Sequence, residues 1–334
     1  MKIAVPMPKY GIFKPAATLA EAQDTIQAHL SGVDALAYAA FIEGNSRAWV
    51  DAQNLLYHWN LDELERKSPV TDYSRLIRQV LRNRLLEVEE RVRKERYTLA
   101  CWNKFTPDIA IEELKAAALN HRIHSHPLLD HMSAEGLPPE AVQLFLDNYY
   151  VNNRVFHLHI AAQSLSAPFS MRAEMYKNLY DELGSGEPSE AHPLLFLRNY
   201  RTLHLPDTII PLTGSVFLLN TKIYHTFLSG NVLQGVGGLG FLELAMPAQM
   251  EKIFAGLKKS NLPVKDLVFW EVHITLDKEH GESWFEEVRD LVRSREDAKA
   301  LFEGGMSLLD ARARFYDDVW GAVQEMIEPQ QMSA

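Results

Sequence analysis

The stretch Glu271-Val-His-Ile-Thr-Leu-Asp-Lys-Glu-His280 contains two histidines and an aspartate at helical spacing. His273, Asp277 and His280 are four and then three residues apart, so an α-helix places all three on one face. At about 1.5 Å of rise per residue, roughly 10 Å of helix axis separates the two histidines. That length is too great for one metal ion to be held simply by all three side chains, and it suits two metal ions a few ångströms apart. A solvated polar helix face is the alternative for this stretch taken alone.

Two other segments offer partners for these side chains. Between Asn178 and His192 one helix is predicted to end at Gly184 and the next to begin near Pro188. A sharp turn there can bring Glu182, at the end of the first helix, and His192, at the start of the second, to one point. The alternative is an ordinary helix cap followed by a surface loop.

Glu243 is a lone carboxylate in the apolar stretch Gly-Phe-Leu-Glu-Leu-Ala-Met of residues 240–246. A buried carboxylate is costly unless it is paired or metal-bound, which makes Glu243 a candidate ligand. A solvent-facing Glu243 is the competing interpretation.

The chain has 334 residues, of which 47% are hydrophobic and 23% charged, as is typical of a globular protein with a substantial core. Its one cysteine, Cys101, excludes an internal disulfide and a thiolate metal cluster. The plentiful metal ligands are therefore the 13 histidines and 44 acidic residues, which favour iron, manganese or zinc over softer metals.

The formal net charge is -10, without a basic tail or a basic stripe. Nucleic acid is therefore not expected as a partner, because phosphate binding needs a concentrated positive surface. Residues 1–8 lack the long apolar stretch of a signal peptide, and no apolar run approaches the length of a membrane span. These features predict a cytoplasmic protein that does not act at a membrane.

Helical periodicity runs through most of the chain, and strand-like alternation is scarce. Residues 1–115 contain no dense cluster of possible ligands and are predicted to form a helical accessory region, with helices at 18–30, 34–41, 46–58 and 71–98. The last of these is amphipathic and long enough to support a homodimer interface. From 116 to 328 an all-α domain is expected, with helices at 138–166, 171–183, 190–203, 212–228, 232–245, 248–257, 265–278, 281–294 and 307–326.

Taken together, these motifs resemble the haem-oxygenase-like di-iron oxidases and oxygenases, which are relatives by fold of the TenA and PqqC proteins. Members combine a carboxylate and a histidine around an Asp-Glu-x-Gly turn, a lone glutamate on a middle helix, and His-x-x-x-Asp-x-x-His on a late helix. The resemblance covers about residues 120–325, and the segment from His126 to Glu140 also resembles the opening of this fold. It implies a haem-oxygenase-like helical bundle in which six residues hold two iron ions: Glu182, His192, Glu243, His273, Asp277 and His280.

The chain departs from the family pattern in the long first helix, where members often offer a further carboxylate. Residues 152–159 read Asn-Asn-Arg-Val-Phe-His-Leu-His and contain no acid. Asn153 and His157 share a helix face, so His157 is a candidate substitute ligand; the alternative is that the position is empty. Arg154 and Asn153 are candidates for binding the substrate. Arg154 could pair with a carboxylate of the substrate; the alternative is that it forms an ordinary ion pair at the protein surface.

Gly235-Val-Gly-Gly-Leu-Gly240 satisfies the dinucleotide-binding glycine pattern, which has meaning only after a strand and within a βαβ unit. The residues before it are predicted to be helical. We therefore expect these glycines to permit close helix packing beside Glu243 rather than nucleotide binding.

Two further signals are discounted. A dense group of four histidines has no cysteine partner and only Asp130 as a carboxylate partner, and we interpret it as fold-opening and surface residues: His121, His124, His126 and His131. No Gly-x-Ser-x-Gly motif is present and Cys101 has no obvious histidine partner, so nucleophilic hydrolysis has no basis in the sequence.

Carboxylate and imidazole ligands on facing helices are how helical proteins build di-iron centres. We predict an oxidoreductase with two iron ions (Fe2+/Fe3+) and O2 as co-substrate, acting on a small amino-acid-derived compound. The preceding accessory region resembles that of the N-oxygenating members, which oxidise amines in natural-product biosynthesis, and an external electron donor can be a further partner. Oxidative C–C cleavage or desaturation of a fatty or amino acid is the first alternative. A metal-free TenA- or PqqC-like enzyme or binding protein is the second, and the choice between iron and manganese stays open.

Overall fold

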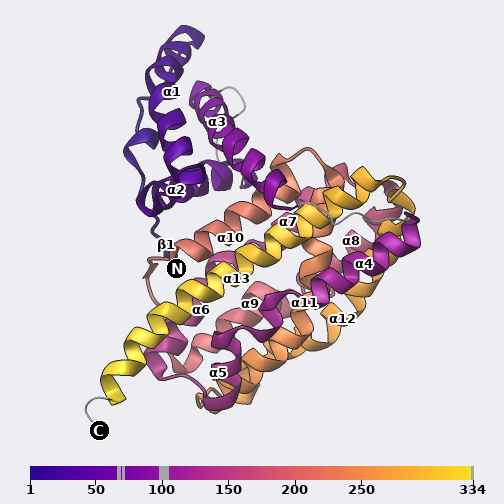
Figure 1. The fold of residues 1–334 in the computed structure, drawn as a ribbon. Coiled ribbons are helices and arrows are strands. Elements are labelled where there is room, and N and C mark those ends of the chain that lie inside the picture. Colours follow the sequence, from indigo (N-terminus) through magenta and orange to yellow (C-terminus); the bar gives the residue numbers. More distant parts are fainter. Residues whose placement is uncertain (66–68, 70–71, 98–104, 332–334) are drawn as a thin grey trace. The chain divides into compact units, whose positions relative to one another are not determined.

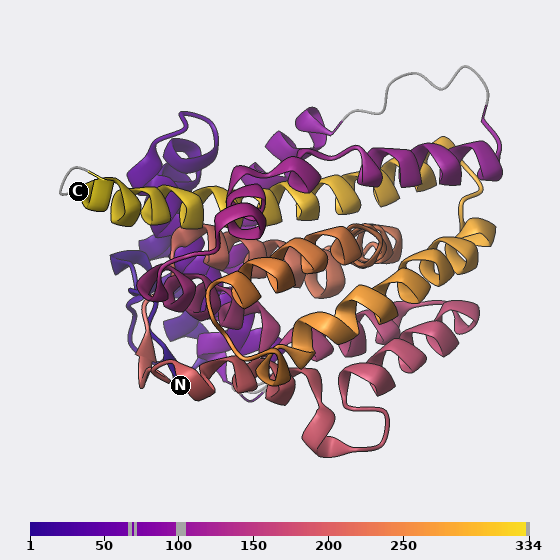
Figure 2. The same cartoon turned by 90° about the horizontal axis from the view of Figure 1, so that it is seen from below.

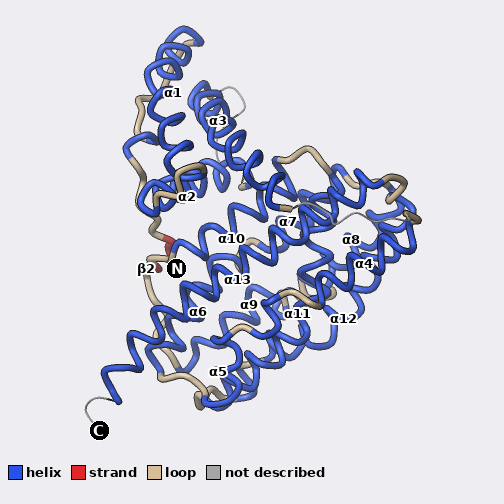
Figure 3. The backbone as a smooth tube through the Cα atoms, viewed as in Figure 1, coloured by secondary structure: helices blue, strands red, loops and turns tan. Residues whose placement is uncertain are grey.

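A computed structural model describes residues 1–65, 69, 72–97 and 105–331, and these residues are almost entirely helical (Figure 1, Figure 3). The predicted all-α fold class is confirmed. The chain divides into two compact units, one formed by Ala4–Thr98 and a larger one formed by Met1–Ile3 with Leu99–Ala334. Cys101, which we interpreted as a cysteine without a histidine partner, lies outside the described residues.

The smaller unit contains the 3₁₀ turn η1 (Lys9–Gly11) and the helices α1 (Leu19–Phe41), α2 (Ser46–Leu64) and α3 (Tyr73–Arg96). Helix α1 packs on both α2 and α3, and the side chains of Thr18 and Glu21 form a capping box at its start. The helices predicted at 18–30 and 34–41 form one helix, because α1 continues through Gly32. A glycine inside a helix costs only about 1 kcal/mol relative to alanine, which tertiary packing readily outweighs.

The larger unit holds a two-residue parallel pair of strands and a bundle of helices. Strand β1 (Lys2–Ile3) pairs with β2 (Thr208–Ile209). The helices are α4 (Pro107–Leu119), η2 (Arg122–Ser125), α5 (Pro127–Glu135), α6 (Pro139–Asn153), α7 (Phe156–Ser166), α8 (Phe169–Glu182), η3 (Pro188–Glu190), α9 (His192–Leu197), η4 (Arg198–Thr202), α10 (Thr213–Ile223), the π-helical η5 (Tyr224–Leu228), α11 (Val232–Lys259), η6 (Val264–Asp266), α12 (Val268–Val288), η7 (Arg289–Leu291) and α13 (Arg295–Gln331).

Helix α4 packs on α11 and α13. Residues 107–115, which the sequence suggested belong to the accessory region, therefore lie with the larger unit, and the division between the units falls ahead of residue 115. None of the described helices combines the length and the apolar character needed to cross a membrane.

Helix α11 is the central element of the larger unit, and it packs against α12, α13, α5, α4 and α7. Figure 2 shows α13 and α12 running on either side of it. Its side chains are buried around most of its circumference, as expected for a helix that is apolar on every face. Two hydrophobic core clusters meet along it, one containing Leu242 and Met246 and the other containing Leu239 and Phe241. Glu243 is therefore placed in the middle of the core.

The glycines of α11 allow close contact with α13. A Cβ atom at Gly237 would collide with the carbonyl oxygen of Leu301, and one at Gly304 of α13 would collide with the carbonyl oxygen of Gln234. The segment before these glycines is helical, as predicted. The interpretation of the glycine pattern as a helix-packing feature is confirmed.

Several predicted helix boundaries in the larger unit are wrong, including the start of the last helix, which begins at Arg295. The predicted helix at 138–166 is broken between α6 and α7, where Val155 adopts φ -122° and ψ 10°, although neither Gly nor Pro marks this position. The predicted break near Pro247 is absent because α11 continues through it. Pro247 lacks the N–H that would bond to the carbonyl oxygen of Glu243, but packing on several sides maintains the helix. Similarly, α12 continues through Gly281.

Candidate metal centre

A compact turn between α8 and α9 brings Glu182 and His192 together. Helix α8 ends at Glu182, close to the predicted end at Gly184, and α9 begins at His192, after the 3₁₀ turn η3 that starts at Pro188. Gly184 has φ +93°, a conformation that side chains disfavour, and a Cβ atom there would collide with the carbonyl oxygen of Glu187 and lie 2.8 Å from Ala191 N. The turn can therefore close only with glycine at this position.

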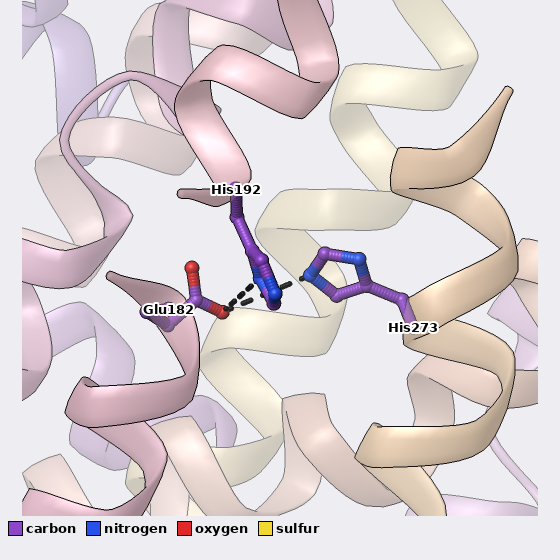
Figure 4. Close-up of side chains that lie close together, drawn as sticks. All are labelled: Glu182, His192 and His273. Atoms are coloured by element: carbon purple, nitrogen blue, oxygen red, sulfur yellow. Dashed lines mark ion pairs between the residues drawn. The ribbon is translucent and has the colours of Figure 1, made fainter. Parts of the chain in front are cut away.

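Glu182, His192 and His273 form the first of two buried groups (Figure 4). Glu182 Oε1 lies 3.1 Å from His192 Nδ1 and 3.7 Å from His273 Nε2. The imidazole rings of His192 and His273 are 4.5 Å apart between centroids. Three side chains from α8, α9 and α12 thus point their donor atoms at a common point.

A backbone carbonyl determines which nitrogen of His273 can act as a ligand. His273 Nδ1 lies 2.6 Å from the carbonyl oxygen of Phe269. A carbonyl oxygen can only accept, so Nδ1 carries the proton and donates it. The lone pair of the neutral ring is then on Nε2, the atom that faces Glu182.

Glu243, Asp277 and His280 form the second buried group. His280 Nδ1 lies 3.9 Å from Glu243 Oε2, while its Nε2 lies 3.2 Å from the Oδ2 atom of Asp181. In each of the two groups the donor atoms lie within 4.8 Å of one another. The six residues come from α8, α9, α11 and α12 and are between 3% and 6% exposed, so bulk water does not solvate them.

The electrostatics show a deficit of positive charge around the second group. Burial, together with the nearby carboxylates, raises the pKa of both Glu243 and Asp277, and Asp277 hydrogen-bonds to Glu243. Burial also opposes the charged form of Glu182, but His192 and His273 together outweigh it and lower the pKa of Glu182. Three carboxylates are thus gathered in a site that disfavours anions.

These residues fit bound cations. Three buried carboxylates and three imidazoles offer hard and borderline donors, which suit iron, manganese or zinc. His192 Nδ1 lies 3.1 Å from Glu182 Oε1, yet it has no hydrogen-bond partner among the described residues. Two ligand atoms that bind the same metal ion can lie this close to each other without a hydrogen bond between them. A divalent ion in each group would neutralise the carboxylates that otherwise repel one another.

A cavity lies against both groups and contains about 480 Å³ of empty space, its open mouth included. Its wall includes Glu243, Asp277 and His273 from the candidate metal site. Apolar side chains form much of the remaining wall, and the polar exceptions come from α6, α10 and α13: Tyr149, Asn152, Asn153, Lys222 and Arg312. A small organic molecule bound here would touch the metal-facing side chains directly.

The less specific sequence candidates have mixed outcomes. Asn153 lines the cavity, whereas Arg154 is not among the described residues that line it. His157 belongs to neither three-residue group. It is partly buried, and within the described part of the chain its Nδ1 atom has no hydrogen-bond partner. Burial lowers its pKa against the opposing influence of Glu182.

Three residues of the site were missed at the level of the sequence. Asp181, which holds His280, stands in the Asp-Glu-x-Gly turn but was not given a role. Lys222 is a lone charged residue in the apolar stretch of α10, and the reasoning applied to Glu243 would have found it. Arg312 lies on the charged helix α13 and carries no such signal.

The dense histidine group is engaged in structural contacts. Nε2 of His121 lies 3.0 Å from Asp310, and Nε2 of His126 lies 3.0 Å from Asp317. His126 Nδ1 also accepts from Leu128 N and caps α5. Helix capping and ion pairing with α13 agree with the interpretation of the group as part of the opening of the fold.

Comparisons with known proteins agree with this site. A family model described as "Iron-containing redox enzyme" matches residues 143–313, which is just over half of the chain. A 4-chloro-allylglycine synthase from Streptantibioticus cattleyicolor is 26% identical over 216 residues, covering 63% of this chain and 82% of that protein.

Solved structures share the fold. A CADD-like protein of unknown function from Nostoc punctiforme has a TM-score of 0.55 at 13% identity, and the match covers 65% of this chain and 98% of that protein's chain. A domain of unknown function with a heme oxygenase-like fold from Shewanella denitrificans has a TM-score of 0.50 at 16% identity, covering 65% and 91%. The chain described here is an oxidoreductase with a haem-oxygenase-like fold and belongs to the family of iron-containing redox enzymes.

Proposed function

We propose that this protein is a non-haem di-iron oxygenase that oxidises a small amino-acid-derived substrate with O2. One iron ion would be held by Glu182, His192 and His273, and the other by Glu243, Asp277 and His280. The observation that carries the proposal is the convergence of these two buried groups on one cavity. Membership of an iron-containing family makes iron the metal of choice.

The bound iron would supply the electrons and the open coordination positions that activate O2. The residues of the chain orient and insulate this chemistry. The Phe269 carbonyl keeps the Nδ1 proton of His273 away from the metal, and Asp181 accepts the Nε2 proton of His280, so that each ring presents its lone pair to its group. The apolar cavity wall excludes water from the reacting bond.

N-oxygenation of an amine is the reaction we favour, because the sequence resembles the N-oxygenating members. Inserting one oxygen atom takes two electrons from the substrate, so reducing the second oxygen atom to water needs two more. We therefore propose an external electron donor as a partner.

Oxidative desaturation or C–C cleavage is the second candidate. The product named in "4-chloro-allylglycine synthase" is an amino acid with a terminal alkene. Forming an alkene from a saturated chain is an oxidative desaturation or cleavage. Both candidates share the amino-acid class of substrate and the same six ligands, and they differ in the product.

The test is reconstitution of the protein with ferrous iron in the absence of oxygen, followed by iron analysis and O2 uptake. We expect two iron ions per chain, loss of iron in His273→Ala, and retention in the control His131→Ala, whose ring packs on Trp320 instead. Fewer than one iron ion per chain, with O2 uptake unaffected by His273→Ala, would remove the oxygenase proposal. Parallel loading with manganese tests the choice of metal. Product mass then separates the candidates, as a gain of oxygen or a loss of CO2 or hydrogen.

A further inference from the structure

Arg312 is a buried cation whose hydrogen-bond partners are all neutral. Its side chain donates to the hydroxyl oxygen of Tyr149 at 2.9 Å, to Gln249 Oε1 at 3.0 Å and to the hydroxyl oxygen of Tyr316 at 3.1 Å. Within the described part of the chain, no carboxylate reaches ion-pair distance of its guanidinium. Arg312 is 3% exposed and lines the cavity. Asp277, which belongs to the candidate metal site, is a carboxylate that acts on Arg312 electrostatically without forming an ion pair. A buried cation without a paired counter-charge is costly, so an anion in the cavity would stabilise it.

Lys222 is a second buried cation on the same cavity. It is 2% exposed, and its Nζ lies 5.2 Å from the centre of the Phe156 ring. The charged groups that act on it are Arg312, which disfavours its charge, and Glu182 and Glu243, which favour it. Burial and Arg312 together lower the pKa of Lys222 to about 7. Metal ions would neutralise Glu182 and Glu243, which favour the charge of Lys222, and Asp277, which acts on Arg312, and both cations of the cavity wall would then need another counter-charge.

Asn152 and Asn153 supply hydrogen-bond acceptors to the same cavity. Asn152 Nδ2 donates to the carbonyl oxygen of Ser215 at 2.9 Å, which determines the orientation of the amide and leaves Oδ1 as the unused atom. The Oδ1 atoms of Asn152 and of Asn153 are buried and have no hydrogen-bond partner among the residues that the structure describes. Both side chains line the cavity and are at least nine-tenths buried. Unsatisfied buried acceptors favour a ligand that donates hydrogen bonds.

We propose that the cavity binds an α-amino acid in its zwitterionic form, with the carboxylate on Lys222 and Arg312 and the ammonium on the Oδ1 atoms of Asn152 and Asn153. Both kinds of side chain line the same cavity, and Lys222 contacts the ring of Phe156, another residue of its wall. Cationic and acceptor groups in one cavity match the carboxylate and ammonium of an α-amino acid. This inference rests on the proposed function and deepens it.

The arrangement also predicts where the substrate reacts. With the α-amino and α-carboxyl groups held by α6, α10 and α13, the side chain of the substrate is the part left to lie along the apolar wall. Leu242, Met246 and Met250 of α11 belong to that wall, beside Glu243. The oxidised atom is therefore in the side chain of the amino acid, and the α-amine is not the nitrogen that is oxidised.

The test measures the binding of matched probes by calorimetry, under anaerobic conditions, to the ferrous protein. The probes are the common L-amino acids and L-norleucine, with hexanoate as the deaminated and pentylamine as the decarboxylated counterpart of norleucine. Wild-type protein is expected to bind norleucine more tightly than either counterpart. Lys222→Met should weaken norleucine and hexanoate by about tenfold or more, with pentylamine unchanged. Asn153→Leu should weaken norleucine and pentylamine and spare hexanoate.

Two controls separate recognition from folding. Lys252→Met makes the same chemical change at a lysine that pairs with Asp130 outside the cavity, and it should leave all affinities unchanged. Lys222→Arg should restore part of the lost affinity. Proton uptake on binding is a further measurement, and it would not change if Lys222 had only a structural role. Norleucine binding above pH 7 should take up a proton in wild type, detected as heats that vary with the ionisation enthalpy of the buffer, and Lys222→Met should abolish this uptake.

The outcome that overturns the inference is the binding of no amino acid by folded, iron-loaded protein, or equal norleucine affinity in wild type and Lys222→Met. Iron content and O2 uptake are measured on the same preparations. If the protein binds iron and consumes O2 but does not bind amino acids, this inference is wrong and the proposed oxygenase function stands. Protein without iron that still binds norleucine through Lys222 sinks the proposed oxygenase and leaves the amino-acid site standing.

Discussion

The Oδ2 atom of Asp181 lies 3.2 Å from Nε2 of His280, so a carboxylate on α8 orients an imidazole on α12. Asp181 is itself held by Ser185, whose hydroxyl donates to Oδ1 at 2.8 Å. Because Nε2 donates its proton to Asp181, the lone pair on Nδ1 faces Glu243 and Asp277. Asp181, the residue just before Glu182, thus orients His280 of the second group, and one turn of α8 contributes to both groups.

Asp181→Asn should weaken iron binding by about 10- to 100-fold, as is typical for residues that orient metal ligands. The amide can still accept from His280, but it lacks the charge that makes the imidazole more basic. Anaerobic titration with ferrous iron measures the effect. Asp130→Asn makes the same change at a carboxylate paired with Lys252 and should bind iron normally; equal affinities in the two variants would contradict the role of Asp181.

Gly184→Ala should reduce both stability and iron content. Positive φ costs alanine more than about 1 kcal/mol, and the collision with Glu187 would force Glu182 away from His192. Gly44→Ala is the matched control, because Gly44 has φ +67° with no heavy atom within 4 Å of an added Cβ. Denaturant unfolding should show a loss in both variants, whereas iron analysis should show a loss only for Gly184→Ala.

His157→Ala is expected to keep two iron ions per chain, because His157 belongs to neither buried group. His192→Ala, by contrast, removes a donor atom from the first group and should lose at least one. Iron analysis after desalting distinguishes the two. A fall to one iron ion in His157→Ala would make His157 the substitute ligand that the sequence suggested.

The stability of the iron-free protein should fall as pH rises above the ordinary carboxyl range. Burial raises the pKa of Glu243 and Asp277, so the folded state binds protons more tightly than the unfolded state, and that advantage is lost as the pH rises towards the raised values. Iron binding needs both groups deprotonated, so iron affinity should rise over the same range. Thermal unfolding of iron-free wild type and Glu243→Gln checks the sign: the variant should show the weaker pH dependence, and an equal or opposite slope would contradict it.

Gly237→Ala should destabilise the protein by about 1–3 kcal/mol, because the added methyl group collides with the Leu301 carbonyl between α11 and α13. Gly321 of α13 offers the control, since an added Cβ there has no neighbour within 4 Å. Gly321→Ala should stabilise the helix by up to about 1 kcal/mol. Guanidinium unfolding of both variants measures the contrast, and a neutral Gly237→Ala would argue against tight packing of α11 on α13.

Local patterns predicted much of this protein. The spacing of His273, Asp277 and His280 needs only helical periodicity to place them on one face. The ends of α8 and α9 are encoded by the residues of the turn, so Glu182 and His192 could be paired from the sequence. A lone carboxylate in an apolar helix led to Glu243 by the cost of burying charge. Each of these inferences uses residues within a few turns of one another.

Other features depend on contacts between distant segments. Packing around α11 maintains the helix through Pro247. The residues near Val155 contain no sequence signal that predicts the break between α6 and α7. The cations that line the cavity are Lys222 and Arg312, from α10 and α13, although Arg154 seemed the natural choice from its place in the sequence.

The sequence by itself determined the helical class, the residue types of the candidate metal site and the face of α12 that carries three of those residues, because helical periodicity and the cost of buried charge act locally. Only the tertiary structure decided how the six side chains divide into two groups and which polar residues share their cavity. That division depends on how α8, α9, α11 and α12 pack, and helix packing is a property of whole surfaces rather than of any single stretch of sequence.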